Sequence, residues 1–435
     1  MGSGPESAGP GTPTEPQPRL PREVWILVAV SFVIAIGFGI LAPALPTFAR
    51  SFDVSVTAVS VVISAFAFTR LVFAPASGRL VTRLGERPVY AGGIFIVGLS
   101  TLACAFATTY WQLLVFRSLG GIGSTMFTVS ALALLVRVTP PPLRGRSTGL
   151  WATSFLLGNV TGPLVGGGLI GFSIRAPFVV YGGALFVAAA VGWFALRRSA
   201  LAAAEPASEV VPLTVRAALR HGAYRAALVS NFTNGWAVFG VRISLVPLFV
   251  TEVLRREEAL AGIALSVFAA GNVAVLMLSG RIADSVGRRP PMILGLLVAA
   301  GGTIWVGFTG SVPAFLAATL ISGVGTGMLT PPQGAAVADV IGAKGKGGPA
   351  LAGFQMAADI GAIIGPLAAG VLADQLSYSA AFAVTGAIAA IAAIVWLRAP
   401  ETLPRRAGDE HTAGQIAAEC GCLDEGLEVP TGRRT

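Results

Sequence analysis

Four charged side chains lie inside long runs of apolar residues: Arg70, Arg117, Arg242 and Asp359. A charge near the middle of a membrane costs about 2.5–3.5 kcal/mol on insertion scales, so such residues are candidates for functional sites. Asp359 is the only carboxylate well inside one of these runs. A carboxylate that is removed from water and unpaired favours its protonated form. These residue types therefore predict proton binding or charge pairing within a membrane.

Two of the arginines share a helical face with other polar residues. Ser124 lies seven residues after Arg117, which is two helical turns. Asn231 and Asn234 share a face with Arg242. Such polar stripes predict the walls of a cavity between helices. The alternative is that each arginine binds backbone carbonyls at a helix bend, because a buried polar group must find partners.

The runs that carry these charges have the composition of membrane spans. The 435 residues are 54% hydrophobic and 12% charged, with a mean hydropathy of +0.76, whereas soluble domains are about a quarter charged. A helix needs roughly 20 apolar residues to cross a hydrocarbon core of about 30 Å. Twelve runs predict an all-α membrane protein with twelve transmembrane helices: 25–48, 56–77, 88–107, 110–136, 148–171, 177–196, 226–250, 260–279, 291–309, 312–338, 349–372 and 378–398.

The chain repeats itself at an offset close to 202 residues. SGRLVTRLGERP starts at Ser77 and SGRIADSVGRRP starts at Ser279, each between two spans. Span 5 contains GNVTGPLVGG from Gly158, and span 11 contains GAIIGPLAAG from Gly361. Duplication inside a membrane is typical of secondary transporters. The repeat predicts two pseudo-symmetric six-helix bundles.

Five segments follow from this division. We expect a disordered Pro/Gly-rich cytoplasmic tail, an N-terminal bundle, a cytoplasmic linker with a short amphipathic helix near 212–222, a C-terminal bundle and a second cytoplasmic tail. Their expected limits are 1–24, 25–198, 199–225, 226–398 and 399–435.

Basic residues concentrate on one side of the predicted membrane. The tails and even-numbered connections hold most arginines, whereas the odd-numbered connections hold Arg50, Arg175, Arg255 and Arg256. Positive loops stay in the cytoplasm, so we expect both termini there. This bias explains the net charge of +9 without a nucleic-acid partner. The near-exclusive use of arginine over lysine favours a high-GC bacterium, and hence the bacterial plasma membrane.

The sequence offers no constellation for enzymatic or cofactor chemistry. We find no nucleophile–base set, nucleotide-binding loop or metal cluster. The tail residues His411, Cys420 and Cys422 are too few ligands to define a metal site. We therefore expect neither an enzyme nor a cofactor.

From about residue 25 to residue 402 the chain resembles the major facilitator superfamily. The two repeated loops fit the family pattern G-x-L-A-D-x-x-G-R-R/K between spans 2–3 and 8–9. The resemblance implies two cytoplasmic gate loops, formed by Gly78, Thr82, Gly85 and Arg87 in the first copy and by Gly280, Asp284, Gly287, Arg288 and Arg289 in the second. The loop acid can cap the N-terminus of a facing helix. The first copy has Thr82 in place of this acid and Glu86 in place of a base, so we expect a weaker first latch.

Span 5 carries the pattern G-x-x-x-G-P-x-x-G-G, formed by Gly158, Gly162, Pro163, Gly166 and Gly167. Glycines four residues apart let another helix approach closely, and the proline bends the span. The pattern resembles the antiporter signature of drug/proton exporters in this family, which implies a close-packed pivot between the bundles. The alternative is ordinary packing of small residues.

The resemblance also assigns roles to the membrane charges. Arg117 fills the arginine of the family's span 4 pattern R-x-x-Q-G-x-G, which is implicated in proton coupling in related antiporters. The family places spans 2 and 11 against each other. We therefore expect Arg70 and Asp359 to pair when the cytoplasmic side is closed, and Asp359 to take a proton when that side opens. A static ion pair is the alternative.

In this family, spans 1, 4, 7 and 10 line a central cavity. The expected substrate cavity contains Asn231, Asn234, Arg242, Trp236, Ser124 and Gln333, with Phe38, Phe66, Phe239 and Met328 as further candidates. Its few hydrogen-bonding groups favour a small amphipathic or hydrophobic compound over a sugar. We expect a monomer that exports such a compound by proton antiport through alternating access, with the compound, protons and membrane lipid as its partners. Uptake of a metabolite or sugar by proton symport or uniport is one alternative, and a non-transporting membrane sensor is another.

Overall fold

The computed structural model describes residues 20–140, 143–196, 215–341 and 348–403, which form helices joined by short connections. Twelve helical segments are long and apolar enough to cross a membrane, which confirms the twelve predicted spans. Six spans form the N-terminal half: α1 (Arg22–Arg50), α2 (Val56–Leu84), α3 (Glu86–Ala105), α4 (Tyr110–Val138), α5 (Arg144–Ile170) and α6 (Ala176–Leu196). Six form the C-terminal half: the joined segments α8 (Gly222–Asn234), η2 (Gly235–Arg242), α9 (Ile243–Leu248) and η3 (Phe249–Val253), then α10 (Ala259–Ser285), α11 (Arg289–Gly307), the pair α12 (Val312–Gly327) and α13 (Thr330–Ile341), α14 (Gly348–Gln375) and α15 (Tyr378–Arg398).

Two expected limits are wrong by a few residues, because buried side chains extend the helices. α1 begins at Arg22, inside the expected 1–24 tail, and Val24 in its first turn is fully buried. The seventh span begins at Gly222, inside the expected 199–225 linker, and Tyr224 in its first turn is fully buried. Packing against the bundle thus starts each helix earlier than the hydropathy of the chain predicts.

The expected amphipathic helix at 212–222 is a single turn, α7 (Val215–Ala218), within the described residues. Ala218 is fully buried against the C-terminal bundle, and a new helix, α8, begins four residues later. Most of the tails and the linker, and with them His411, Cys420 and Cys422, lie outside the described residues.

Matching glycines bring matching helices together in the two halves. In the N-terminal half, a Cβ added to Gly93 of α3 would lie 2.7 Å from the carbonyl oxygen of Gly123 on α4. In the C-terminal half, a Cβ added to Gly295 of α11 would lie 2.9 Å from the carbonyl oxygen of Gly325 on α12. Both pairs are separated by the 202-residue offset of the repeat. The repeat in the sequence is therefore a repeat of helix contacts.

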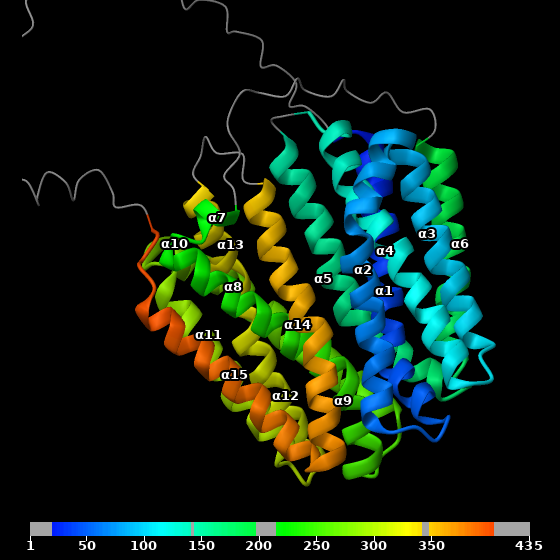
Figure 1. The fold of residues 1–435 in the computed structure, drawn as a ribbon, viewed down its shortest axis with the longest axis vertical. Coiled ribbons are helices and arrows are strands. Elements are labelled where there is room, and N and C mark those ends of the chain that lie inside the picture. The colour runs from blue at the N-terminus through cyan, green and yellow to red at the C-terminus, as the bar shows by residue number, and fades with distance from the viewer. Residues whose placement is uncertain (1–19, 141–142, 197–214, 342–347, 404–435) are drawn as a thin grey trace, which may run out of the picture.

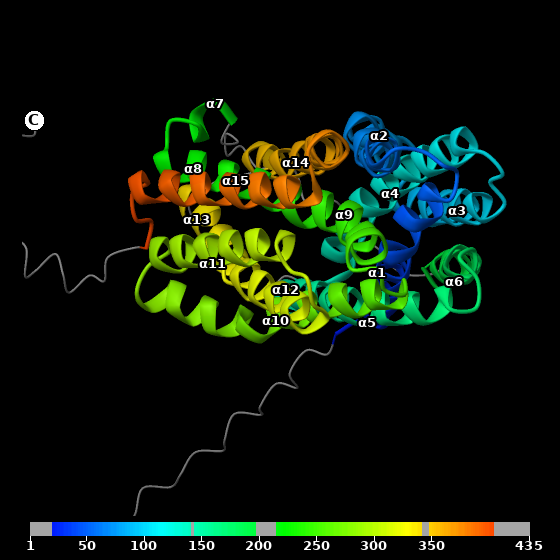
Figure 2. The ribbon, with the colours of Figure 1, turned by 90° about the horizontal axis from the view of Figure 1, so that it is seen from below.

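The two bundles lie side by side and are inclined to one another (Figure 1). We call the side where α1 begins and α15 ends the terminal face, and the other side the opposite face. The bundles approach each other at the lower end of Figure 1, where α2 begins, and diverge toward the upper end, where α1 begins. Seen from the opposite face, the N-terminal and C-terminal bundles form two separate groups of helices joined along one seam (Figure 2).

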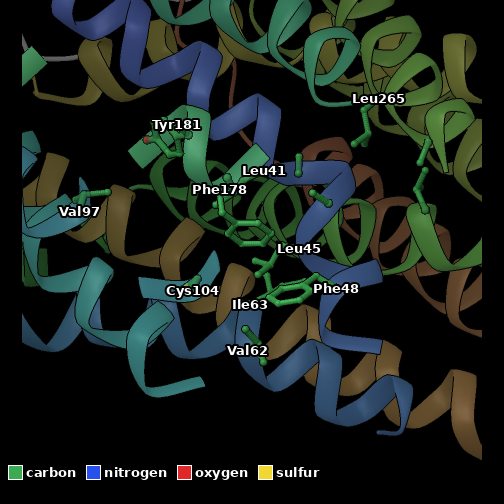
Figure 3. Packing of buried hydrophobic residues seen from close by; sticks show 14 of the residues in the cluster. Leu41, Leu45, Phe48, Val62, Ile63, Val97, Cys104, Phe178, Tyr181 and Leu265 are labelled. Carbon is green, nitrogen blue, oxygen red and sulfur yellow. The ribbon is translucent and has the colours of Figure 1, made fainter. Parts of the chain in front are cut away.

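Apolar packing joins the bundles near the opposite face. One cluster of buried residues contains Phe48 and Val59 from the N-terminal bundle together with Val246 and Phe249 from the C-terminal bundle. Figure 3 shows its centre, where Leu45 and Phe48 of α1 meet Ile63 of α2 and Phe178 of α6. A second cluster belongs to the C-terminal bundle, and contains Tyr224, Met292 and Trp396.

Large apolar side chains also cover the outer surface of the helices. Examples with more than half of their surface exposed are Leu99, Val187, Met277, Leu278 and Ile391. A protein in water rarely shows extended apolar surface of this kind. Together with the twelve spans, it identifies a multi-pass membrane protein.

Candidate functional site

Three adjoining hollows lie along the seam, and Phe38 and Phe239 line all three. Their volumes are about 220, 200 and 150 Å³. Together they fall in the range of sites for drug-sized ligands, about 300–1,000 Å³. Arg70 and Arg117 face the first and third hollows, and Arg242 faces the second. We call the three hollows the central cavity.

Arg117 on α4 is buried in the N-terminal wall of the cavity, with 5% of its surface exposed. Its guanidinium carbon lies 3.9 Å from the centroid of the Phe66 ring. Its Nε has no hydrogen-bond partner, and no described backbone carbonyl accepts from this side chain. A ring face stabilises a cation but accepts none of its five fixed N–H groups in the way that oxygen does. The alternative of carbonyl binding at a helix bend therefore does not describe Arg117.

Arg242 ends the π-helical segment η2 and is 6% exposed. Its Nη2 donates to the hydroxyl of Ser322 on α12 at 2.7 Å, and its guanidinium carbon lies 3.4 Å from the centroid of the Phe268 ring. Nε and Nη1 have no hydrogen-bond partner. Short π-helical segments are frequent at functional sites. Here such a segment delivers a buried cation to the cavity wall.

Arg70 on α2 and Asp359 on α14 face the same hollow from opposite bundles. Gln355, one turn before Asp359, reaches its carboxylate, and Arg70 lies near enough to act on its charge. The two charges do not form an ion pair in this conformation, in contrast to four other pairs among the described residues. Their pairing in a state closed at the terminal face stays a prediction.

Several expected cavity residues do line the cavity. They are Ser124, Asn234, Arg242, Phe38, Phe66 and Phe239. Met328 is instead packed against Gly295 of α11, where a Cβ added to the glycine would lie 2.8 Å from the Cβ of Met328.

Three predicted cavity residues, Asn231, Trp236 and Gln333, form hydrogen bonds between helices of the C-terminal bundle, and their place in the cavity stays a prediction. Asn231 donates to a backbone carbonyl of α14 at 2.6 Å, and Trp236 Nε1 donates to a threonine hydroxyl of α15 at 3.2 Å. Gln333 donates to the hydroxyl of Ser230 at 2.8 Å. Buried polar groups are nearly always hydrogen-bonded. The π-helical register after Asn234 also breaks the single helical face that Asn231 and Arg242 were expected to share.

Two asparagines that the sequence interpretation missed also line the cavity. Asn159 of α5 and Asn272 of α10 face the hollow that contains Arg242 and Asn234. The sequence did carry a signal for each. Asn159 lies within the glycine pattern of span 5, and Asn272 stands one repeat offset of 202 residues after Arg70.

The second loop of the terminal face is a network of charges. Gly287 has φ +127°, a conformation that other residues rarely adopt. Arg288 Nη1 donates to Asp284 at 2.7 Å, and Arg288 Nε donates to Asp339 at 3.2 Å. Asp284 was expected to cap a facing helix, but Glu401 takes that role, accepting from the backbone N–H groups of Arg288 (2.7 Å) and Arg289 (3.0 Å) at the start of α11.

Glu401 is therefore a structural cap of α11, and this role lowers the pKa of its carboxyl group. Burial raises the pKa of its carboxyl, but backbone N–H groups of residues 288, 289, 402 and 403 bind the charged form and hold the pKa below its ordinary value. The helix dipole adds to the preference for negative charge at this end of α11.

The first loop of the terminal face has a different chemistry. Gly85 has φ +84°. The hydroxyl of Thr82 donates to the Arg79 carbonyl of its own helix at 2.8 Å. Glu86 accepts from Arg137 of α4 at 2.5 Å. This ion pair stands one repeat offset before Arg288 and Asp339, with the two signs exchanged.

The glycine pattern of span 5 divides between two contacts. Gly158, Gly162 and Gly166 pack against α1 of their own bundle, and a Cβ on Gly158 would lie 2.5 Å from that of Ala35. Gly167 meets α10 of the other bundle, where its added Cβ would lie 2.9 Å from the carbonyl oxygen of Ala259. The contact between bundles thus involves Gly167 and the carbonyl of Pro163, which faces Gly262 of α10, whereas the other three glycines pack within one bundle.

A set of polar contacts that the sequence interpretation missed closes the opposite face. Arg50 at the end of α1 pairs with Glu252 of η3 at 2.7 Å, and Glu252 also accepts from the hydroxyl of Tyr378 at 2.8 Å. Asp374 of α14 accepts from the backbone N–H groups of Val56 (3.0 Å) and Thr57 (2.7 Å) at the start of α2. We call these residues the opposite-face gate.

The small residues of the seam are also related by the repeat. Gly370 of α14 contacts Thr57 and Ser60 of α2. On the other side of the seam, Gly167 of α5 contacts Ala259 and Gly262 of α10. Ala259 and Gly262 follow Thr57 and Ser60 by 202 residues. The seam therefore has the pseudo-twofold symmetry that the sequence predicts.

The sequence profile of the Major Facilitator Superfamily matches the chain twice, over residues 27–254 and 227–422. The chain belongs to this superfamily. Multidrug resistance protein 2 of Bacillus subtilis (strain 168) is 29% identical over 174 residues, which are 40% of this chain and 44% of that protein. Tetracycline resistance protein, class E, of Escherichia coli is 26% identical over 283 residues, which are 63% of this chain and 70% of that protein. The chain thus spans less than half of the first of these relatives.

A solved structure has the same fold. The crystal structure of a bacterial homologue of the human lysosomal transporter Spinster, in an inward-facing and unoccupied conformation, matches with a TM-score of 0.75. Its sequence identity is 16%, and the match covers 86% of this chain and 95% of that chain. The likeness confirms the major facilitator fold predicted from the sequence. The profile match and this likeness together place the chain in the superfamily by sequence and by fold.

Proposed function

We propose that this transporter exports a small amphipathic or hydrophobic compound by alternating access, in exchange for protons. The observation that carries the proposal is the central cavity, whose walls combine aromatic residues such as Phe38 and Phe239 with a few polar groups. Apolar walls with few convergent polar groups suit such cargo. The resemblance to multidrug and tetracycline resistance proteins supports export as the direction.

Alternating access requires the contacts along the seam between the two bundles to break and form again. Positive loops assign the terminal face to the cytoplasm, so the opposite-face gate lies outside and the cavity loads from inside the cell. Outward release requires the Arg50–Glu252 pair and the Asp374 cap to break. The proposed location is the bacterial plasma membrane, with both termini in the cytoplasm and a monomer as the working unit.

Proton coupling is assigned to Asp359, with Arg70 as its partner in the state closed at the cytoplasmic side and Arg117 as the neighbouring cation. Arg70 and Asp359 face one hollow from two bundles, so rocking the bundles changes their separation. An unpaired carboxylate in this place binds a proton more readily than a paired one. Each opening would thus exchange a charge pair for a bound proton.

Everted membrane vesicles test the proposal, with neutral N-phenyl-1-naphthylamine and cationic ethidium as probes. An exporter accumulates a probe inside everted vesicles when a proton gradient, acid inside, is imposed, whereas an uptake symporter or a non-transporting sensor does not. We expect Asp359→Asn to abolish the dependence on the gradient, and Asp53→Asn, in an exposed loop, to leave it unchanged. Gradient-dependent accumulation at the full rate in Asp359→Asn would refute proton coupling through this residue.

A further inference from the structure

The charges that face the central cavity are strongly unequal. Among the described residues, its walls hold three cationic side chains, Arg70, Arg117 and Arg242, and one acidic side chain, Asp359. With Asp359 ionised the walls carry a net charge of two positive units, and with Asp359 protonated they carry three. A cavity with this excess attracts negative charge and repels positive charge.

Two of these cations lack a counter-charge in the structure. Arg242 has one polar partner, the neutral hydroxyl of Ser322, and its Nε and Nη1 are buried without a partner. Arg117 has a ring beside it and an unpartnered Nε. Both side chains are more than nine-tenths buried. Removing a cation from water is costly unless an anion and hydrogen bonds replace the water.

The surroundings of Arg242 fit an anionic group better than a structural ion pair. Three asparagine side chains, Asn159, Asn234 and Asn272, face the same hollow. Their amide N–H groups can donate to the oxygens of an anion. Phe38 and Phe239 continue from this polar end into the other two hollows. One end of the cavity is therefore a set of donors, and the rest is an apolar slot.

We propose that the cargo is an organic anion: an amphiphile whose carboxylate, sulfonate or phosphate binds Arg242 and the three asparagines, while its apolar body lies between Phe38 and Phe239. The inference rests on the proposed transport function, and it narrows the cargo from amphipathic compounds in general to those with an acidic head. Hydrogen bonds from guanidinium to such heads are charge-assisted and short, and the unpartnered Nε and Nη1 of Arg242 leave donors for them. Arg117 supplies a second positive charge on the facing wall.

Competition in lipid nanodiscs tests the sign of the charge on the wild-type protein. N-phenyl-1-naphthylamine, whose fluorescence rises in apolar sites, serves as the neutral reporter, and empty nanodiscs give the background. The competitors are naphthalene-1-sulfonate and 1-naphthylmethylammonium, which share a ring system and differ in charge. Hydrogen bonds to charged groups are worth about 1.5–3 kcal/mol, so the sulfonate should displace the reporter at about 10- to 100-fold lower concentration. Equal potency, or a preference for the ammonium compound, would overturn the proposal.

Variants at Arg242 then locate the preference. We expect Arg242→Gln to remove most of the preference for the sulfonate, measured in each variant as the potency of the sulfonate relative to the ammonium compound, because the amide carries no positive charge. Arg242→Lys keeps the charge but loses the planar fork, so it should retain an intermediate preference. Arg175→Gln, in an exposed loop of the opposite face, is the matched control and should retain the whole preference. An undiminished preference in Arg242→Gln would overturn the assignment of the head group to this residue.

The two proposals fail in distinguishable ways. If the reporter is pumped under a proton gradient but the charged competitors are equally potent, the anion proposal falls and export stands. If the sulfonate is preferred and the preference depends on Arg242, but no gradient moves any probe, export falls and the anion site stands.

Discussion

Asp374 should control the closure of the opposite face more strongly than the ion pair beside it. Its carboxylate accepts from two backbone N–H groups and the hydroxyl of Thr57 at the start of α2, which belongs to the other bundle. Two of the orphan donors of that helix thus depend on a side chain that is near only when this face is closed. The substitution Asp374→Ala removes all three of these hydrogen bonds. We expect the variant to favour conformations that are open at the opposite face.

The expected magnitude follows from the geometry. Loss of a helix N-cap costs about 0.5–2 kcal/mol, which shifts the ratio of closed to open molecules by about 2- to 30-fold. The Arg50–Glu252 contact is a single ion pair between side chains that are 39% and 31% accessible, and it leaves no helix N–H group without an acceptor when it breaks. Exposed pairs contribute about 0.2–1 kcal/mol. The predicted order of effect is therefore Asp374→Ala above Arg50→Gln.

Distance measurements between spin labels check this order. Cysteines at Phe172 and Leu376 place labels on the opposite face of the two bundles, and both positions are largely exposed (89% and 70%). The native cysteines 104, 420 and 422 are first replaced by serine or alanine. In nanodiscs, the long-distance population should grow most in Asp374→Ala, less in Arg50→Gln and not at all in Asp53→Asn, an exposed loop control. A distance distribution in Asp374→Ala that matches Asp53→Asn would refute the reasoning.

Three further predictions concern the seam and the loops of the terminal face. Gly262→Ala should slow transport at least several-fold without loss of folded protein, because its Cβ would strike the carbonyl of Pro163 across the seam, whereas Gly168→Ala, with open space around it, should match the wild type in a vesicle flux assay. Glu86→Arg should lower the thermal midpoint, because it places two positive charges together. The double variant Glu86→Arg/Arg137→Glu should recover most of the loss. A double variant that is no more stable than Glu86→Arg alone would contradict the pairing. The pKa of Glu401 is lowered in the folded protein, so the stability that its charged form contributes is complete above the ordinary glutamate pKa of about 4.3. This contribution is lost as the pH falls through the lowered pKa. The thermal midpoints of the wild type and Glu401→Gln should therefore differ at pH 7 and converge in acid.

The sequence predicts the helices well because each span must satisfy its own backbone hydrogen bonds in lipid. The hydropathy of twelve runs therefore identifies twelve spans, and errors are confined to ends such as Arg22 and Gly222, where packing extends a helix. The 202-residue repeat identifies the two bundles, because matching glycines such as Gly93 and Gly295 make matching contacts.

The site is less predictable, because a polar side chain in a membrane helix has two ways to be satisfied. Arg242 and Asn234 face the cavity, whereas Asn231 and Gln333 bind other helices of their own bundle. Composition and helical spacing do not separate these outcomes. The π-helical segment η2 changes the register between Asn231 and Arg242, and a periodicity of 3.6 residues cannot anticipate it.

The ion pair of the opposite-face gate requires the two halves of the duplicated chain to differ in sequence. A residue on the pseudo-twofold axis meets the residue one repeat offset away, as Arg50 meets Glu252 at a separation of 202 residues. In a perfect duplicate both positions would hold the same residue, so a charged position on the axis would repel its own copy. Opposite charges at this offset are thus possible only after the halves diverge.

Two kinds of charge reversal distinguish the N-terminal half from the C-terminal half. Glu86 and Arg137 are exchanged in sign relative to Arg288 and Asp339, yet each pair lies within one bundle, so attraction is preserved on both sides. The exchange at Arg50 and Glu252 instead creates an attraction between bundles that the undiverged repeat could not have. A charged position whose repeat mate has the opposite charge, and whose own bundle supplies no ion-pair partner, is therefore a candidate for the axis of any duplicated transporter. Arg50→Glu should consequently open the opposite face more than Arg50→Gln does, and Glu252→Arg added to Arg50→Glu should close it again in the same spin-label measurement, whereas persistent opening in the double variant would show that the two residues do not meet on the axis.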